Sequence, residues 1–228
     1  HDVVAGIATL DGATGTLDRL VWINGMQIMQ DGRVLLATEE MPQAIYGAGR
    51  TDTIGNRLRY SSHLDQAVWA ASPGGFFDVV GHSNRAISGV GSMGPAFTVH
   101  FPDRIALARP SGQDDPPLTI EPSAAYVGTQ SHRTLQNDST GHEVFFGDDG
   151  GIWVFDGQGV NKLTDAQELF ARFYSGPTFK YSWRSSVDTI KDEYWLVLPA
   201  ALNLSYSDIW SVNTKTGKAA RWFVNANI

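Results

Sequence analysis

The acidic side chains that could form a catalytic pair in this chain are Asp78, Asp103, Glu121 and Glu143. A glycoside hydrolase needs two carboxyl groups about 5 to 9.5 Å apart, one as the acid and the other as the nucleophile or base. Nothing around any of the four distinguishes it from an ordinary surface acid, and the S-x-D-x-G-x-T-W turn of sialidase propellers is absent. A paired-carboxylate site therefore stays an alternative rather than the main hypothesis.

Calcium binding is a second candidate chemistry, with oxygen ligands from Asp148, Asp149 and Asp156. The segment lacks the D-x-D-x-D-G spacing and the closing bidentate Glu of a calcium loop. Turn chemistry explains the same residues more simply, because Asp caps its own backbone and tolerates a left-handed conformation. The chain has no cysteine and no H-x-x-x-H or H-E-x-x-H pattern, so we expect no metal centre and no cofactor. Its histidines are His1, His63, His82, His100, His132 and His142.

Two glycine-rich segments resemble catalytic motifs only in part. SGVGS at 88–92 has no G-K-[ST] after it and no helix is expected there, which excludes a P-loop. GHSNR at 81–85 ends in Arg85, where a nucleophile elbow requires glycine. The sequence therefore predicts a protein that is not an enzyme.

Aromatic side chains offer two interpretations, because they can stack on sugar rings or fill the space between sheets. Within β-hairpins they usually pack between neighbouring sheets, where each buries a large apolar area. We therefore predict a set of aromatic residues in the cores of the sheets, and exposed rings at Trp69, Trp153 and Trp210 would instead favour sugar binding. The predicted core aromatics are Trp22, Trp69, Phe145, Trp153, Trp195 and Trp210.

The segment that must position these aromatics runs from Gly141 to Gly157, GHEVFFGDDGGIWVFDG. Asp-Gly and Gly-Gly between apolar runs are strong hairpin signals, because the turn positions need positive φ. Weaker copies of this strand–turn–strand pattern occur at 19–40, 55–71 and 191–217. The spacings from Trp22 to Trp69 and from Trp153 to Trp210 are roughly 45 to 60 residues, near the length of a propeller blade. The longer gap from Trp69 to Trp153 leaves room for one more unit, so the repeat is irregular. We expect an all-β, propeller-like fold of about four blade-sized antiparallel units, as a single domain over 1–228.

Two stretches depart from the strand pattern. Residues 110–123 hold four of the ten prolines and are predicted to be an inter-blade linker. Residues 163–173, LTDAQELFARF, predict one short helix, with Thr164 as the N-cap, Gln167 three residues on, and apolar side chains on one face.

Composition narrows the function classes. The formal charge of −7 and pI near 5.2 leave no basic footprint for tight nucleic-acid binding. An acidic wall would still suit a conduit, because it repels phosphate and lets the polymer slide. No stretch approaches the roughly 20 apolar residues that span a bilayer. The chain starts at His1, so we expect it to be trimmed or part of a longer product.

The order of segments from Gly55 to about residue 225 resembles that of a family of bacteriophage structural proteins. These are the β-propeller proteins of the short-tail hub or nozzle and the related packaged-DNA stabilisation proteins. The segments that carry the resemblance are GNRLRYSSHLDQAVW at 55–69, FFDV at 76–79, AISGVGSMGPAFTVHFPDRIALA at 86–108, FFGDDGGIWVFDGQGVNKLTD at 145–165 and SDIWSVNTKTGKAARW at 207–222.

The resemblance implies a non-enzymatic virion protein, present as a homo-oligomeric ring on the tail axis. Such a protein would extend the DNA channel below the portal, retain packaged DNA and dock adaptor, fibre or other tail proteins. Its contact with genomic DNA would be transient, and none with a membrane is expected. The alternative is a carbohydrate-binding propeller, either a lectin or a glycoside-active domain.

Overall fold

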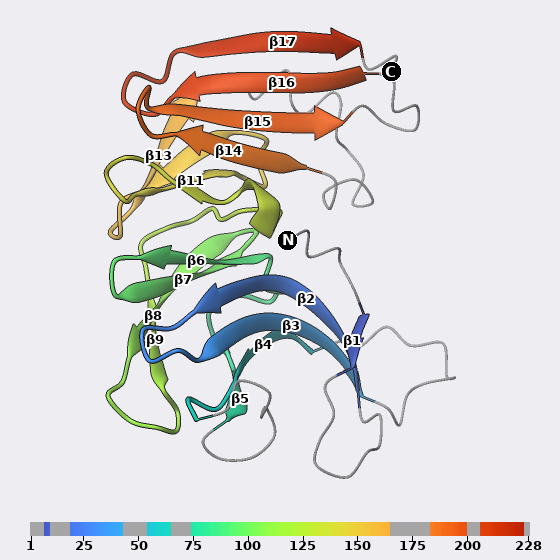
Figure 1. The fold of residues 1–228 in the computed structure, drawn as a ribbon, viewed down its shortest axis with the longest axis vertical. Helices are drawn as coiled ribbons and strands as arrows, with labels where there is room; N and C mark the ends of the chain where they lie inside the picture. The colour runs from blue at the N-terminus through green and yellow to red at the C-terminus, as the bar shows by residue number, and fades with distance from the viewer. Residues whose placement is uncertain are drawn as a thin grey trace. The chain divides into compact units, whose positions relative to one another are not determined.

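The protein is all-β, as the sequence predicts. The computed structural model describes residues 7–9, 19–42, 54–64, 74–164, 183–199 and 206–225. These residues form four antiparallel sheets, with strand orders β1-β2-β3-β4-β5, β6-β7-β8-β9, β10-β11-β12-β13 and β14-β15-β16-β17 (Figure 1). Each sheet is a meander in which consecutive strands are neighbours, and such blade-sized units are what a propeller-like fold requires.

The strands occupy most of the described chain. Their bounds are β1 (Ile7–Thr9), β2 (Arg19–Ile28), β3 (Val34–Pro42), β4 (Ile54–Tyr60), β5 (Gly75–Asp78), β6 (Gly89–Met93), β7 (Ala96–Phe101), β8 (Arg104–Pro110), β9 (Leu118–Pro122), β10 (Gln136–Asn137), β11 (Glu143–Phe146), β12 (Ile152–Phe155), β13 (Val160–Thr164), β14 (Arg184–Asp188), β15 (Glu193–Pro199), β16 (Tyr206–Asn213) and β17 (Ala219–Asn225). A single 3-10 turn at His132–Thr134 is the one helical element among the described residues.

Two sequence predictions concern the connections. The proline-rich stretch 110–123 contains the end of β8, a loop and β9, which pairs with β8 from Ala106↔Pro122 to Pro110↔Leu118. Of the predicted helix at 163–173, Leu163 and Thr164 belong to β13, because Thr164 pairs with Ile152 of β12. The rest of that range lies outside the described residues.

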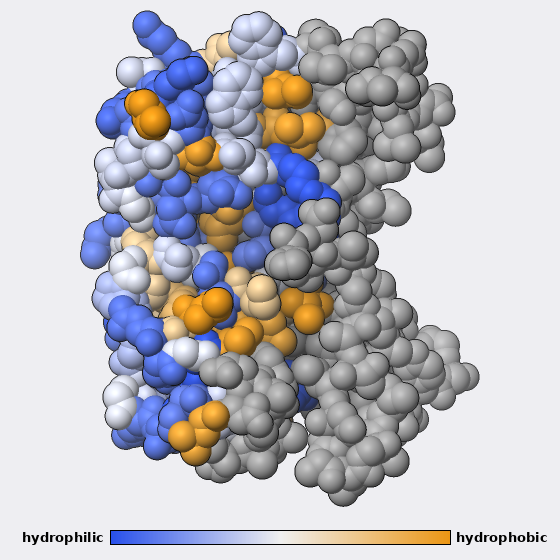
Figure 2. Space-filling model, viewed as in Figure 1, coloured by the Kyte–Doolittle hydropathy of each residue, from blue (hydrophilic) through white to orange (hydrophobic). Residues whose placement is uncertain are grey.

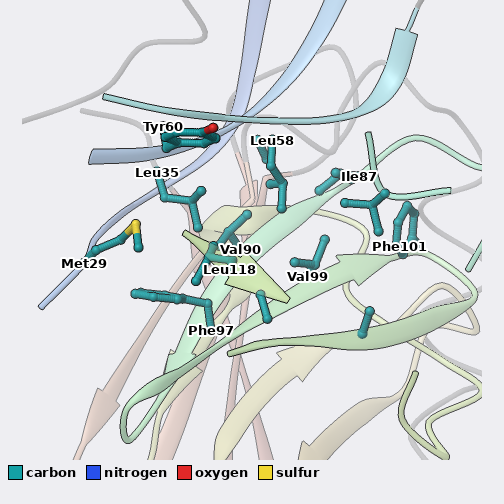
Figure 3. Close-up of a cluster of buried hydrophobic side chains, with 14 residues drawn as sticks. Met29, Leu35, Leu58, Tyr60, Ile87, Val90, Phe97, Val99, Phe101 and Leu118 are labelled. Carbon is teal, nitrogen blue, oxygen red and sulfur yellow. The ribbon is translucent and has the colours of Figure 1, made fainter. Parts of the chain in front are cut away.

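The chain divides into two compact units, and the first comprises 1–101 with 106–122. Its β1–β5 and β6–β9 sheets share one apolar core (Figure 3). Alternate positions face it, such as Leu35 and Ala37 of β3, as the two-residue period of a strand requires. The core residues are Met29, Leu35, Ala37, Leu58, Tyr60, Val79, Ile87, Val90, Phe97, Val99, Phe101, Ala106, Ala108 and Leu118.

A polar clasp joins three segments of this unit. The Arg33 guanidinium, 2% exposed, donates from Nη1 to the Asp114 carbonyl at 2.8 Å and from Nη2 to Asp114 Oδ1 at 2.9 Å. The Tyr60 hydroxyl donates to Asp115 Oδ1 at 2.5 Å. Burial, followed by this hydrogen bond and the Asp115 charge, raises the pKa of Tyr60, so the hydroxyl stays protonated and able to donate. The clasp ties the β8–β9 loop to β3 and β4.

We expect Tyr60→Phe to lower the free energy of unfolding by about 1 to 2 kcal/mol, because the ring stays in the core and one hydrogen bond to a charged acceptor is lost. Urea denaturation measures the change. Tyr126→Phe is the matched control, since Tyr126 is 68% exposed. Equal losses in the two variants would mean that the Asp115 hydrogen bond does not stabilise the unit.

The second unit comprises 102–105 with 123–228. Its β10–β13 and β14–β17 sheets also share a core. The Tyr194 hydroxyl of β15 donates to the carbonyl of Thr134, in the 3-10 turn before β10, at 2.6 Å. Burial raises the pKa of Tyr194, which keeps this donor protonated. The core residues are Val144, Phe146, Ile152, Val154, Trp183, Tyr194, Leu196, Leu198, Trp210 and Val212.

Candidate functional site

The predicted hairpin is confirmed in the second unit. β11 and β12 pair from Glu143↔Phe155 to Phe146↔Ile152. Their turn is closed by Gly147 N donating to the Gly151 carbonyl at 2.8 Å. Gly150 has a φ of 78°, a conformation that side chains with a Cβ rarely adopt. The glycines that indicate the hairpin in the sequence are therefore required by its backbone.

The Asp149 carboxylate sits inside this turn with three partners. Oδ1 accepts from Trp153 Nε1 at 2.8 Å and from Gly151 N at 2.9 Å, and Oδ2 lies 3.2 Å from Lys162 Nζ. A Cβ on Gly147 would lie 2.8 Å from the Trp153 ring, and a Cβ on Gly151 would lie 2.6 Å from Lys162 Cε. Both glycines thus make room for one indole–carboxylate–ammonium cluster.

The partners of Asp149 in the cluster favour the ionised form of its carboxylate. Burial alone would raise the pKa of this carboxyl, but the hydrogen bonds from Trp153, Gly151 and Lys162, together with the lysine charge, lower it below its ordinary value of 3.8. Asp156 accepts from Gln158 N and Gly159 N, both at 2.9 Å, so it caps its own turn. Turn and packing chemistry therefore account for the two aspartates most central to the calcium alternative.

Asp149→Ala should destabilise the chain by about 2 kcal/mol at pH 7, because three donors to a charged acceptor lose their partner. Since the folded pKa is depressed, the stabilisation is present above the unfolded pKa and is lost as pH falls through the folded pKa. The difference between wild type and variant should therefore shrink in urea titrations taken below about pH 4.

Asp148→Ala serves as the control for this prediction, because Asp148 is exposed on the same turn. We expect Asp148→Ala to lower the free energy of unfolding by less than Asp149→Ala does. The free energies of unfolding of the wild type and Asp149→Ala are compared from neutral to acid pH. A difference that did not change with pH would contradict an ionised, hydrogen-bonded Asp149.

The predicted core aromatics fall into three groups. Phe145 and Trp153 face each other across β11 and β12, at 0% and 6% exposure, and Trp210 of β16 is 5% exposed in the second unit's core. Trp195 is half-buried on the opposite face of the β14–β17 sheet. Trp22 lies in β2, where its side chain is not described, and Trp69 lies outside the described residues.

Sequence reasoning missed one core tryptophan. Trp183, just before β14, is 2% exposed and packs edge-on against Phe146, with ring centroids 5.1 Å apart and planes at 77°. The two-residue period of a strand could have placed it. Trp183, Ser185 and Val187 are alternate residues and so share one face, and Val187 packs against the same core.

Three of the four candidate catalytic acids are neutralised by nearby arginines. The Arg57 guanidinium contacts the Asp78 carboxylate at 2.7 and 2.9 Å. Asp103 lies 3.5 Å from the adjacent Arg104, and Glu121 of β9 lies 3.1 Å from Arg109 of β8. Glu143 differs from the expected surface acid, because it is fully buried in β11. The carboxylates of Asp78, Asp103 and Glu121 therefore lie in ion pairs with arginines. Among the described residues, no cluster of three His, Asp or Glu side chains could hold a metal ion.

The Arg57–Asp78 pair joins two segments that carry the phage resemblance. It connects β4 to β5 through the register pair Arg57↔Asp78. The Arg57 guanidinium also lies 3.8 Å from the centre of the Phe76 ring, and that of Arg59 lies at 5.3 Å. Such cation–π stacking and a bidentate ion pair lock the two strands together on the face opposite the core.

Comparison with known proteins leaves the family open. No family model and no curated protein matches the chain. Among solved structures, it is similar to the extracellular domain of a one-component system from B. thetaiotaomicron, at 12% sequence identity and a TM-score of 0.43. That similarity covers 90% of this chain and 30% of the other. Across the described residues, no helix has both the length and the apolar character needed to cross a bilayer.

Proposed function

We propose that this chain is a structural component of a bacteriophage tail, in the hub, nozzle or head–tail connector. It extends the DNA channel below the portal, retains packaged DNA and docks other tail proteins. The segments that resemble the phage family support this proposal, because they coincide with strands of the fold: 55–60 with β4, 76–78 with β5, 145–164 with β11 to β13, and 207–222 with β16 and β17.

The observation that carries the proposal is the burial of Trp153 and Trp210. The rings of Trp153 and Trp210 are 6% and 5% exposed and so have no free face for a sugar. The indole N–H of Trp153 also donates a hydrogen bond to Asp149. Aromatics used in this way stiffen the sheets, which suits a scaffold better than a lectin.

The proposed partners follow from a place in the virion. Several copies would form a ring on the tail axis, contacting the portal or adaptor on one side and fibre or tail proteins on the other. Contact between the channel wall and genomic DNA would be transient, since a net charge of −7 repels phosphate. Neither catalysis nor membrane contact is part of the proposal.

Fractionation of phage particles tests this function. We expect an immunoblot to find the chain in density-purified particles from the source culture, and a glycan array to show no binding by the recombinant chain. Binding to a glycan, together with absence from the particles, would replace the proposal with the carbohydrate-binding alternative.

A further inference from the structure

The β14–β17 sheet has a second face, directed away from the core of its unit. Core side chains on this sheet come from alternate positions, such as Leu196 and Trp210. Residues of the other parity therefore point outward. The register aligns four of them in one row across the sheet. This outer row consists of Arg184, Val197, Ile209 and Trp222.

The outer row is accessible and partly apolar. Trp222 is 53% exposed and Arg184 is exposed, while Val197 and Ile209 are half-buried. The Trp222 indole lies along the sheet, with Nε1 3.5 Å from Ser211 Oγ of the neighbouring strand. Apolar side chains gather over β15 and β16 on this face (Figure 2). A flat, half-exposed indole beside two aliphatic side chains is the composition of an interface rather than of an ordinary surface.

The order of the outer row is self-complementary. A two-fold axis parallel to the strands and midway between β15 and β16 exchanges the two halves of the row. It places Val197 over the partner's Ile209 and Arg184 over the partner's Trp222. The first contact buries aliphatic surface and the second sets a guanidinium on an indole face, an attractive pairing.

The charges at the other end of the face obey the same symmetry. There the row reads Asp188 on β14, Glu193 on β15, Asn213 on β16 and Lys218 just before β17, with Asn213 N bonded to the Lys218 carbonyl at 2.9 Å. The same rotation places Asp188 near the partner's Lys218 and Glu193 near the partner's Asn213. No like charges meet in either row.

We propose that this face of the β14–β17 sheet binds the same face of a second copy of the chain, as an isologous two-fold dimer. Such a contact pairs two copies and is then complete, so it is distinct from the heterologous contacts that close a ring. Stacking of two sheet faces repeats the packing that forms each unit's core. The dimer does not depend on the proposed tail role.

Sedimentation velocity over a concentration series tests the proposal. We expect a reversible monomer–dimer equilibrium in the wild type. Trp222→Ala should weaken association by at least about tenfold, because the aromatic anchor over the partner's Arg184 is removed. Ile190→Ala is the matched control: Ile190 is 93% exposed in the β14–β15 turn, outside the outer row, and its replacement should leave the equilibrium unchanged.

An exchange of residues tests the symmetry itself. Trp222→Arg sets a guanidinium against the partner's Arg184 and should abolish the dimer. Adding Arg184→Trp restores one cation and one ring to each pair, and the dimer should return. The thermal unfolding midpoint of each variant checks that the monomer is folded. A wild type that is monomeric at every concentration, or a Trp222→Ala variant that dimerises as the wild type does, would overturn the proposal.

Discussion

Replacing Trp210 with alanine is expected to lower the free energy of unfolding by about 3 to 5 kcal/mol, the range for removing a large aromatic from a packed core. Trp210 is 5% exposed and lies in the core that joins the β10–β13 and β14–β17 sheets. Its ring also lies 5.3 Å from the Arg221 guanidinium. The cavity would open between two sheets that do not share strands, so neither sheet could close it by repacking alone.

The matched control is Trp222→Ala, on the neighbouring strand of the same sheet. Trp222 faces away from the core and is 53% exposed, so its loss should cost about 1 kcal/mol or less in the monomer. Urea denaturation, followed by far-UV circular dichroism at concentrations where the chain is monomeric, gives both values. Similar losses in the two variants would contradict the assignment of Trp210 to the core.

Replacing Gly217 with alanine should cost about 3 kcal/mol or more, because a left-handed residue gains a Cβ and the Cβ has no space. Gly217 has a φ of 69° and closes the turn between β16 and β17. A Cβ there would lie 2.3 Å from the Leu163 carbonyl oxygen of β13, a backbone atom that cannot rotate away. The substitution must therefore move either the turn or β13.

Gly94→Ala separates the two causes. Gly94 has a φ of 57°, and its added Cβ would meet nothing within 4 Å. Only the backbone penalty should remain, about 1 to 2 kcal/mol. Thermal or urea unfolding of both variants measures the difference. If Gly217→Ala cost no more than Gly94→Ala, the close approach of the turn to β13 would be wrong.

The hairpins and the repeated sheets were predictable because their signals are local. Positive φ at Gly150 and Gly157 restricts those positions to a few residue types, and the flanking apolar runs define the strands. The same reasoning placed Phe145 and Trp153 on facing strands. The prolines of 110–123 suggested a linker, but Pro110 and Pro122 are the last residues of β8 and β9, where a missing N–H is tolerated.

The polar contacts were not predictable, because they join distant parts of the sequence. Arg33 meets Asp114 across 81 residues, and Tyr60 meets Asp115 across 55. Nothing near Arg33 in the sequence separates it from a surface arginine, although it is 2% exposed. The Asp149–Trp153 hydrogen bond spans only four residues. It was still not predicted, because the preference of Asp for turns was already a sufficient explanation for Asp149 in the sequence.

The proposed scaffold role in the tail can be tested by immunogold electron microscopy. Antibody to this chain would be applied to intact particles from the source culture, with binding to disrupted particles showing that the epitope is accessible. A tail role predicts label at a single tail vertex of each particle. Absence of label from every particle, with the epitope shown accessible, would contradict it.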